Sequence, residues 1–156
     1  STALAGAHVT HVDASRPAMN WARANQRLSG LDERPIRWLI DDVVKFVKRE
    51  RRRGSKYEGI ILDPPVFGRG PKGEIWRFSE SFPELMREVA GLLSDDPLFV
   101  LVNAYAITES SLVLHNLLAE HAPTRTGTFE AGELTLRERG PGGRLLPTSR
   151  FARWRA

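Results

Sequence analysis

Short apolar runs alternate along the chain with stretches in which apolar residues recur every three to four positions. The apolar runs at residues 36–40, 60–62 and 97–102 are too short for helices and are rich in Val, Ile and Leu, and residues 8–12 alternate between polar and apolar positions, so all four segments predict strands. Helical periodicity follows at 15–28, 43–53, 81–93 and 108–118. This alternation predicts an α/β fold with a Rossmann-like, doubly wound and mostly parallel sheet.

Polar residues mark where the helices should begin. Ser15 is a good N-cap with Pro17 in the following turn, Ser81 and Glu84 form a capping-box pattern, and Thr108 precedes the last periodic stretch. Glycines that should end the first two helices are Gly30 and Gly54. The residues of the first helix that share one face by helical spacing are Ala18, Trp21, Ala22, Asn25 and Leu28.

The pattern changes near the C-terminus to two extended segments, residues 132–137 and 144–152. A turn with three glycines, residues 140–143, joins them and predicts an antiparallel hairpin at the edge of the sheet. No internal repeat or low-complexity tract divides the chain. Residues 1–156 are therefore expected to form a single domain.

An acid and two prolines end the apolar run at 60–62, which we expect to be a strand buried on both faces. Asp63 then lies at the carboxyl end of a strand, the edge where open α/β sheets bind ligands. Pro64 and Pro65 stiffen the loop that follows, and its Gly/Pro-rich continuation to Gly73 is long enough for a lid or a binding loop. The alternative interpretation is an ordinary turn that ends a strand.

Charge is unevenly placed along the sequence. The chain has 23 basic and 19 acidic residues, with seven basic side chains between Lys45 and Lys56 and six arginines between Arg137 and Ala156. Two basic clusters favour a polyanionic partner such as nucleic acid. The first cluster also has a structural explanation, because cations in the last turn of a helix complement its dipole.

Composition excludes several kinds of chemistry. The absence of cysteine rules out disulfides, thiolate metal sites and cysteine nucleophiles, and the four scattered histidines have no metal-ligand spacing, so no metal is expected. No apolar run approaches the length of a membrane span, and no signal-peptide pattern is present. These features predict a cytoplasmic protein without a membrane partner, and they leave its oligomeric state open.

Four separate motifs carry a family resemblance. In chain order they are residues 9–15 (Val-Thr-His-Val-Asp-Ala-Ser), 21–31, Asp41-Asp42-Val43, and 63–70 beginning Asp-Pro-Pro. Together they resemble the class I S-adenosylmethionine-dependent methyltransferases, nearest to the bacterial large-subunit ribosomal RNA methyltransferases. The resemblance covers nearly the whole chain.

The resemblance implies roles for particular residues. Asp13, in the motif with Ala14 and Ser15, corresponds to the acid that binds the cofactor's ribose hydroxyls, and Asp42 with the Val43 backbone N–H corresponds to the adenine contacts. In the Asp-Pro-Pro motif, Asp63 and the Pro64 carbonyl would hold the target nitrogen beside the transferring methyl, with Pro65 following and Phe67 stacking on the base. The residues expected to contact the nucleic acid are Arg51, Arg52, Arg53, Arg69 and Lys72.

The sequence departs from the family pattern in three ways. Val66 stands where amino-methylating members have their aromatic residue, and the cysteine nucleophile of cytosine-C5 methylating members is absent, which leaves nitrogen, or second to it oxygen, as the acceptor. The glycine-rich loop that follows the family's first strand is missing, so a domain truncated at its N-terminus is expected. That first strand belongs between the strands that end at Asp13 and Asp63.

These features favour an S-adenosylmethionine-dependent methyltransferase that acts on a base nitrogen of ribosomal RNA. A non-catalytic RNA-binding module on the same fold is one alternative. A methyltransferase of proteins or small molecules is another, in which the basic clusters are solvated surfaces.

Overall fold

The computed structural model describes residues 2–69, 73–122 and 126–156, so Lys72 lies outside the described residues. The chain separates into two compact units, one ending at Arg49 and the other beginning at Glu50. The boundary falls within helix α2 (Val43–Arg53). Within the described ranges, no helix is long and apolar enough to cross a membrane.

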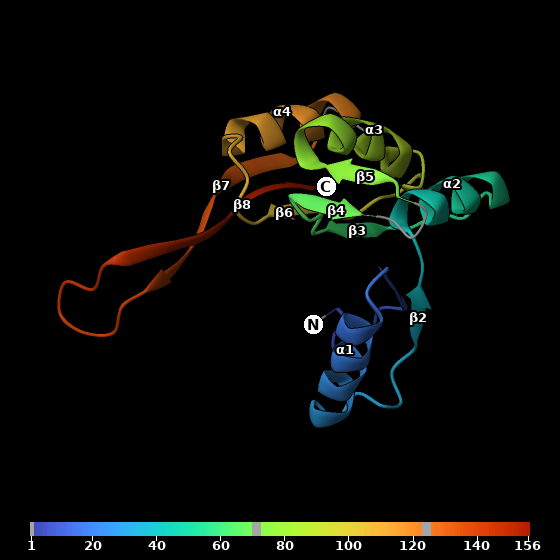
Figure 1. The fold of residues 1–156 in the computed structure, drawn as a ribbon, viewed down its shortest axis with the longest axis horizontal. Helices are drawn as coiled ribbons and strands as arrows, with labels where there is room; N and C mark the ends of the chain where they lie inside the picture. The colour runs from blue at the N-terminus through green and yellow to red at the C-terminus, as the bar shows by residue number, and fades with distance from the viewer. Residues whose placement is uncertain (1, 70–72, 123–125) are drawn as a thin grey trace. The chain divides into compact units, whose positions relative to one another are not determined.

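The first unit is a strand–helix–strand arrangement followed by the start of α2. Strand β1 (Val9–Asp13) pairs in parallel with β2 (Ile36–Ile40), and Asp13 lies opposite Ile40. Helix α1 (Arg16–Leu28) connects the two strands and contacts both (Figure 1). Parallel pairing requires such a crossover, so the residues that follow the two strands meet at one edge.

The ends of α1 follow the sequence signals. The Ser15 side chain accepts a hydrogen bond from the Ala18 N–H at 3.3 Å and so caps the helix. At the other end, the Leu31 N–H bonds the Gln26 carbonyl at 3.1 Å around Gly30, whose φ of 64° is in the left-handed region. This pattern is the Schellman motif, and it explains the glycine.

The face of α1 that is buried differs from the expected one. Met19 is 1% exposed, whereas Trp21 and Leu28 are 72% and 87% exposed, so the stripe predicted through these two residues is wrong. The inner face includes the polar Gln26, which donates to the Leu31 carbonyl at 2.8 Å and accepts from the Trp38 indole at 3.2 Å. A polar side chain with satisfied hydrogen bonds can face inward, and apolar periodicity alone does not reveal it.

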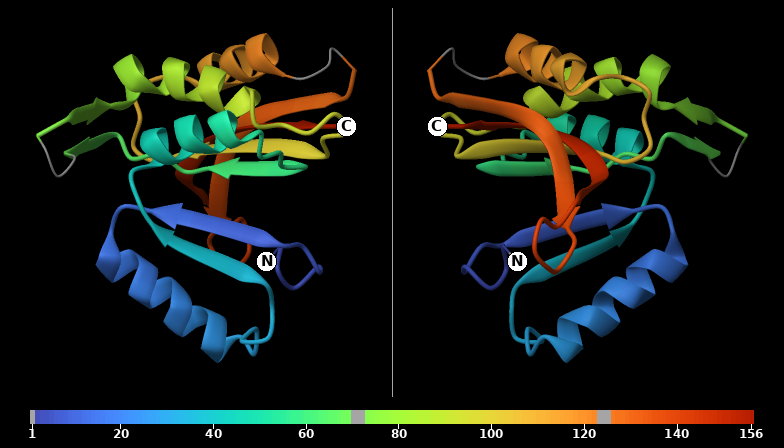
Figure 2. Two further views of the ribbon diagram at one scale, coloured as in Figure 1. Left: turned by 90° about the vertical axis from the view of Figure 1, so that its right-hand side faces the viewer. Right: turned by 90° about the vertical axis from the view of Figure 1, so that its left-hand side faces the viewer.

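The second unit contains a mixed four-stranded sheet in the order β3-β6-β8-β7. Strands β3 (Gly59–Leu62) and β6 (Phe99–Ala104) are parallel, while β8 (Leu145–Arg155) is antiparallel to both β6 and β7 (Thr128–Arg137). The α/β class and the C-terminal hairpin are thus confirmed. Strands β7 and β8 continue beyond the sheet as a two-stranded ribbon (Figure 2).

Strands β1 and β3 belong to different sheets. Within the described residues the pairings of β1 are with β2 and those of β3 are with β6. Because the two strands belong to separate units, the expected place of a further strand between them stays a prediction.

The core of the second unit lies between its sheet and helices α3 (Phe78–Ala90) and α4 (Ser111–His121) (Figure 1). Side chains alternate along β6, so Val100 and Val102 are 2% and 0% exposed, and Trp154 beside them on β8 is 1% exposed. Strand β3 was expected to be buried on both faces, but Ile61 is 54% exposed. Because β3 is the terminal strand of its sheet, it has one strand neighbour there rather than two.

The segment between β3 and α3 is more ordered than the sequence suggests. Strands β4 (Phe67–Arg69) and β5 (Ile75–Arg77) form a short antiparallel hairpin, and α3 begins directly after it at Phe78. Phe78 and Phe82 are 4% and 1% exposed, and their rings stack with centroids 4.6 Å apart. Burial of these rings starts the helix earlier, so the capping box expected at Ser81 is wrong.

The start of α4 also differs from the expected one. Ser110, rather than Thr108, is the N-cap residue, and its side chain makes no capping hydrogen bond. Leu114 and Leu118, which are both 1% exposed, bury the inner face of this helix. Two apolar residues one turn apart therefore position α4 without a capping side chain.

Candidate functional site

Asp13 closes β1 at the carboxyl edge of the first unit. Its Oδ1 accepts the Ser15 N–H at 2.7 Å, so the Asp13-Ala14-Ser15 turn is held by a local hydrogen bond. Ser15 in turn caps α1. A half-buried carboxylate fixed in this way still has Oδ2 available as an acceptor, which suits it to bind a pair of hydroxyl groups.

Asp41 and Asp42 lie beside Asp13 but differ in their partners. Asp42 caps α2, because its Oδ1 accepts the Lys45 N–H at 2.8 Å, and Val43 is the first residue of that helix. Asp41 accepts from Arg49 at 2.6 Å, and this hydrogen bond holds the pKa of Asp41 below its ordinary value against the opposing effect of burial. Since Asp41 is already ion-paired, Asp42 is the better placed of the two to meet a ligand.

The acids that end or follow strands β1 and β2 therefore lie side by side, as the parallel pairing of these strands requires. The Asp41 N–H donates to the Asp13 carbonyl at 3.2 Å, which continues the pairing of β1 with β2. The residues that the structure brings to this edge are Asp13, Ala14, Ser15, Asp42 and Val43.

Asp63 is held at the carboxyl end of β3 by a residue that sequence reasoning missed. The side-chain N–H of Asn103 donates to Asp63 Oδ1 at 2.9 Å, and the side-chain oxygen Oδ1 of Asn103 accepts from the Ser149 hydroxyl at 2.6 Å. Asn103 follows its apolar run much as Asp63 follows the run at 60–62, and β3 and β6 are parallel neighbours. That parallel position is the signal that could have identified Asn103.

The loop after Asp63 is braced by the β4–β5 hairpin. The Trp76 indole N–H donates to the Pro65 carbonyl at 2.6 Å, and the Phe78 N–H donates to the Val66 carbonyl at 2.9 Å. Phe67, the first residue of β4, is 52% exposed. The stiff loop predicted from the two prolines is thus held by a tryptophan that sequence reasoning did not single out.

The basic cluster at the end of α2 is partly engaged within the protein. Arg51 bonds Glu88 at 2.7 Å, and Arg53 bonds Glu50, which is 2% exposed, at 3.1 Å. Arg52 is exposed, as is Arg69 on β4. Two of the three arginines therefore have structural partners, and Arg52 is the member of the cluster best suited to contact a phosphate.

The C-terminal arginines are also largely paired with carboxylates. Arg153 and Arg155 lie 2.5 Å and 3.7 Å from the Glu130 carboxylate, and Arg150 lies 3.9 Å from that of Glu133. These pairs join β7 to β8 across the hairpin. Their positive charge is thus partly neutralised, and a polyanion would meet a weaker field than the sequence count implies.

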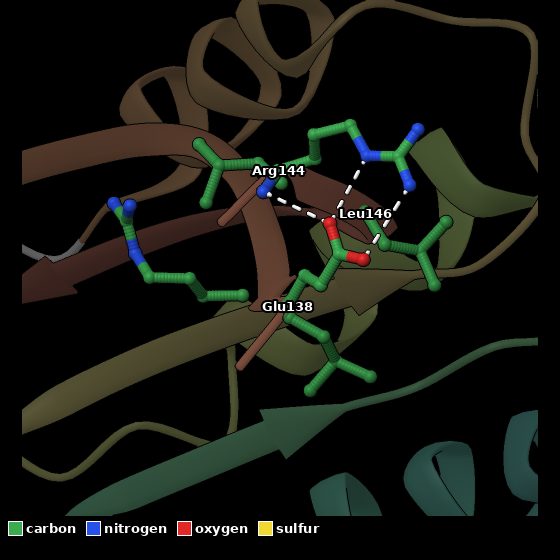
Figure 3. Close-up of a pocket in the computed structure, with 6 residues that line it drawn as sticks. Glu138, Arg144 and Leu146 are labelled. Carbon is green, nitrogen blue, oxygen red and sulfur yellow. Dashed lines mark hydrogen bonds and ion pairs between the residues drawn. The ribbon is translucent and has the colours of Figure 1, made fainter. Parts of the chain in front are cut away.

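Residues that the structure describes form a larger and a smaller surface hollow in the second unit. The larger, of about 430 Å³, lies on the ribbon, where Glu138 and Arg144 form an ion pair at 3.0 Å (Figure 3). Its lining residue nearest to Asn103 along β8 is Leu146, five residues from Phe151, which pairs with Asn103, or about 17 Å of extended chain. The smaller, of about 290 Å³, lies at the carboxyl end of β6. Its lining residues are Ala104, Tyr105, Ala106, Ile107, Glu133, Pro147, Thr148, Ser149 and Arg150.

The solved structures include one with clear sequence and structural similarity. A SAM-dependent methyltransferase from Agrobacterium tumefaciens matches 98% of this chain with 44% identity and a TM-score of 0.91. The chain has the fold of a class I methyltransferase. The methyltransferase SMU.776, solved in complex with SAH, matches 93% of this chain with 20% identity and a TM-score of 0.72, and so supports the methyltransferase fold alone.

The curated relatives of this chain agree with the family resemblance that its motifs indicate. The ribosomal RNA large subunit methyltransferase I of Klebsiella pneumoniae is 42% identical over 59 residues, which are 38% of this chain. The protein of the same name from Aeromonas salmonicida is 29% identical over 104 residues, or 67% of this chain. No protein-family model matches the sequence.

The chain is short compared with these methyltransferases. The matched regions span 15% and 26% of the two curated relatives, and the chain covers 50% of the Agrobacterium structure. Across residues 2–69, 73–122 and 126–156, no group of three or more His, Cys, Asp or Glu side chains is arranged to hold a metal ion.

Proposed function

We propose that this chain is part of an S-adenosylmethionine-dependent methyltransferase that modifies a base nitrogen of ribosomal RNA in the cytoplasm. The observation that carries the proposal is the 44% identity to a SAM-dependent methyltransferase over 98% of the chain. The names of the curated relatives support ribosomal RNA as the substrate. That residues 1–156 act as one methyltransferase domain remains a prediction.

The acidic edge of the first unit suits the adenosine part of the cofactor. Asp13 would bind the ribose hydroxyls, and Asp42 with the Val43 N–H would bind the adenine ring. The hydrogen bonds already made by Asp13 and Asp42 engage Oδ1 in each case, which leaves Oδ2 for the ligand. S-Adenosylmethionine, when bound, supplies a methyl group made electrophilic by its sulfonium.

Asp63 would act by holding the target nitrogen in line with that methyl. Asn103 engages Oδ1, which assigns Oδ2 to the N–H of the substrate, while the Pro64 carbonyl accepts a second N–H. Phe67 is exposed, as stacking on a base requires, although Val66 precedes it. Such positioning holds the target nitrogen and the methyl group in a reactive geometry. Most of the rate enhancement over the uncatalysed reaction would come from this orientation.

The test is methyl transfer from labelled S-adenosylmethionine into total ribosomal RNA, measured with the complete methyltransferase of which this chain is proposed to be part. Asp63→Ala should lower kcat by about 100-fold, the effect of a misplaced reactant, with cofactor affinity nearly unchanged. Its melting temperature should fall by no more than a few degrees, because Asp63 is exposed and loses one partly solvated hydrogen bond, that from Asn103. Asp96→Ala, an exposed aspartate of the same unit, is the matched control and should keep full activity. Wild-type rates for Asp63→Ala would refute the role given to Asp63.

RNA binding through the basic cluster is tested separately by salt titration. Arg52→Ala should make the slope of log affinity against log salt shallower by about 0.7 to 0.9, which is one lost phosphate contact. Arg27→Ala is the control, because Arg27 also lies in the last turn of a helix but outside the cluster. Arg51 and Arg53 should not be changed in this test, since both hold carboxylates of the fold. Identical slopes for the two variants would mean that the cluster is only a solvated helix end.

A further inference from the structure

The smaller hollow lies next to the hydrogen-bonded chain that holds Asp63. Ser149 lines the hollow and also donates to Asn103, whose amide donates to Asp63. In the sheet register, Ala104 lies opposite Arg150, so the loop after β6 and the adjacent part of β8 form two walls of the hollow. A ligand in this hollow would therefore sit beside the residue proposed to hold the target nitrogen.

The loop that forms one wall is fixed in an uncommon conformation. Ala106 has φ of 55°, in the left-handed region that residues with a Cβ adopt less readily than glycine. Ile107 next to it is 4% exposed, and its carbonyl accepts a hydrogen bond from Arg150. Tyr105, in contrast, is 69% exposed. Backbone held in a sparsely populated region often marks a functional site, and here it presents an aromatic ring to solvent.

The chemistry of the lining fits a planar base that carries hydrogen-bond donors. The ring of Tyr105 offers a stacking surface, and sequence-specific RNA recognition stacks unpaired bases on such side chains. Glu133, whose side chain is 51% exposed, offers carboxylate acceptors, while Arg150 is shared between the Ile107 carbonyl and Glu133. The hydroxyls of Thr148 and Ser149 donate within the protein, so towards a ligand they act as acceptors.

The size of the hollow limits what it can hold. Its volume of about 290 Å³ is at the lower end of the range for small-molecule pockets, which suits one nucleobase better than a dinucleotide. Acceptor groups pair with an exocyclic amino group, as found on adenine and cytosine, and uracil has none. Asp63 and Asn103 are not among the lining residues, so the base in the hollow is a neighbour of the reacting base.

We infer that this hollow binds an unpaired, amino-bearing base that flanks the methylated nucleotide. Tyr105 stacks on this base and Glu133 accepts a hydrogen bond from its amino group. The inference rests on the proposed RNA substrate and adds a determinant of sequence preference to it. The residues involved come from the β6 loop and the β7–β8 pair, all within the second unit.

The experiment measures binding of the purified protein to short single-stranded oligoribonucleotides of adenine, cytosine or uracil by fluorescence anisotropy. Wild type should prefer adenine and cytosine to uracil. Tyr105→Ala should weaken binding of all three by about 5- to 150-fold, the value of one lost stacking contact, whereas Tyr105→Phe keeps the ring and should bind normally.

Substitution of the acid tests the base preference. Glu133→Ala should abolish the preference for adenine and cytosine over uracil. Glu138→Ala is the matched control, since it also releases an arginine from its carboxylate on the same hairpin but lies outside the smaller hollow. The control should retain the wild-type preference.

Three outcomes would overturn the inference: unchanged binding by Tyr105→Ala, equal wild-type affinity for the three oligonucleotides, or no wild-type binding to any of them. Methyl transfer into ribosomal RNA by the wild-type protein decides the proposed function independently. A protein that transfers methyl but fails the binding test would keep the proposed function and lose the base site. A protein that transfers no methyl to RNA would lose the proposed function even if it binds oligonucleotides with the expected preference.

Discussion

Replacement of Asn103 by alanine should show how much of the methyl-transfer rate depends on the orientation of the Asp63 carboxylate, because the carboxylate itself is kept. Asn103 links Asp63 and Ser149 through hydrogen bonds of 2.9 Å and 2.6 Å. Its removal leaves the Asp63 side chain intact. The Asp63 carboxylate, in an exposed loop, then lacks the Asn103 N–H donor that holds it in one rotamer. We expect the methyl-transfer rate to fall while the carboxylate itself remains.

The size of both effects follows from the geometry. The bond to Asp63 has a charged acceptor and the bond to Ser149 is neutral, and both are partly solvated, so their loss should cost about 1 to 2 kcal/mol of stability. For a chain of this length such a cost lowers the melting temperature by about 2 to 8 °C. The rate should fall by about 10- to 100-fold, because a displacement of about 1 Å in a reacting group can cost 100-fold.

The assay is single-turnover methyl transfer into ribosomal RNA, measured well below the melting temperature and with cofactor affinity determined in parallel. Ser149→Ala breaks only the outer hydrogen bond and should reduce the rate by about fivefold or less, since a neutral bond typically contributes about 1 kcal/mol. The rates should therefore decrease in the order wild type, Ser149→Ala, Asn103→Ala, Asp63→Ala. If Asn103→Ala reacts at the wild-type rate, or loses cofactor affinity instead, the positioning argument is refuted.

Three further predictions concern binding, stability and pH. In a complete methyltransferase that includes the glycine-rich loop, Asp13→Ala should weaken S-adenosylmethionine binding by about 1.5 to 3 kcal/mol in calorimetry, the value of hydrogen bonds to a charged acceptor, and unchanged affinity would contradict its ribose role. Glu50 is 2% exposed and accepts hydrogen bonds from the Tyr57 hydroxyl at 3.0 Å and from Arg53 at 3.1 Å. Glu50→Ala loses both bonds to a charged acceptor and should cost about 3 kcal/mol in urea unfolding, whereas Tyr57→Phe loses one and should cost clearly less; equal costs would show that the Arg53 bond adds little. Arg49 lowers the pKa of Asp41, so the ion pair should stabilise the fold at neutral pH. This contribution should be lost as the pH falls below about 3.8, the ordinary value, through the lower folded-state pKa. Asp41→Asn should therefore reduce the loss of stability in acid, and an unchanged acid transition in this variant would argue against the contribution of the ion pair.

Local features of the sequence were sufficient for the positions of the acids and for the order of the elements apart from the β4–β5 hairpin. Apolar runs and helical periodicity are properties of neighbouring residues, and a residue that follows a parallel strand must lie at the carboxyl edge of the sheet. For this reason Asp13, Asp42 and Asp63 were found without coordinates. The Ser15 cap and the glycine after α1 were predictable on the same local grounds.

Tertiary structure decided which of these residues acquire partners. Asn103 lies 40 residues from Asp63 and 46 from Ser149 along the chain, and Arg51 lies 37 residues from Glu88. Such contacts depend on strand register and helix packing, which the periodicity of a single segment does not specify. The sequence by itself therefore determined where carboxylates and arginines occur. Packing between distant segments decided that Asp63 is oriented by an amide and that much of the positive charge is paired within the protein.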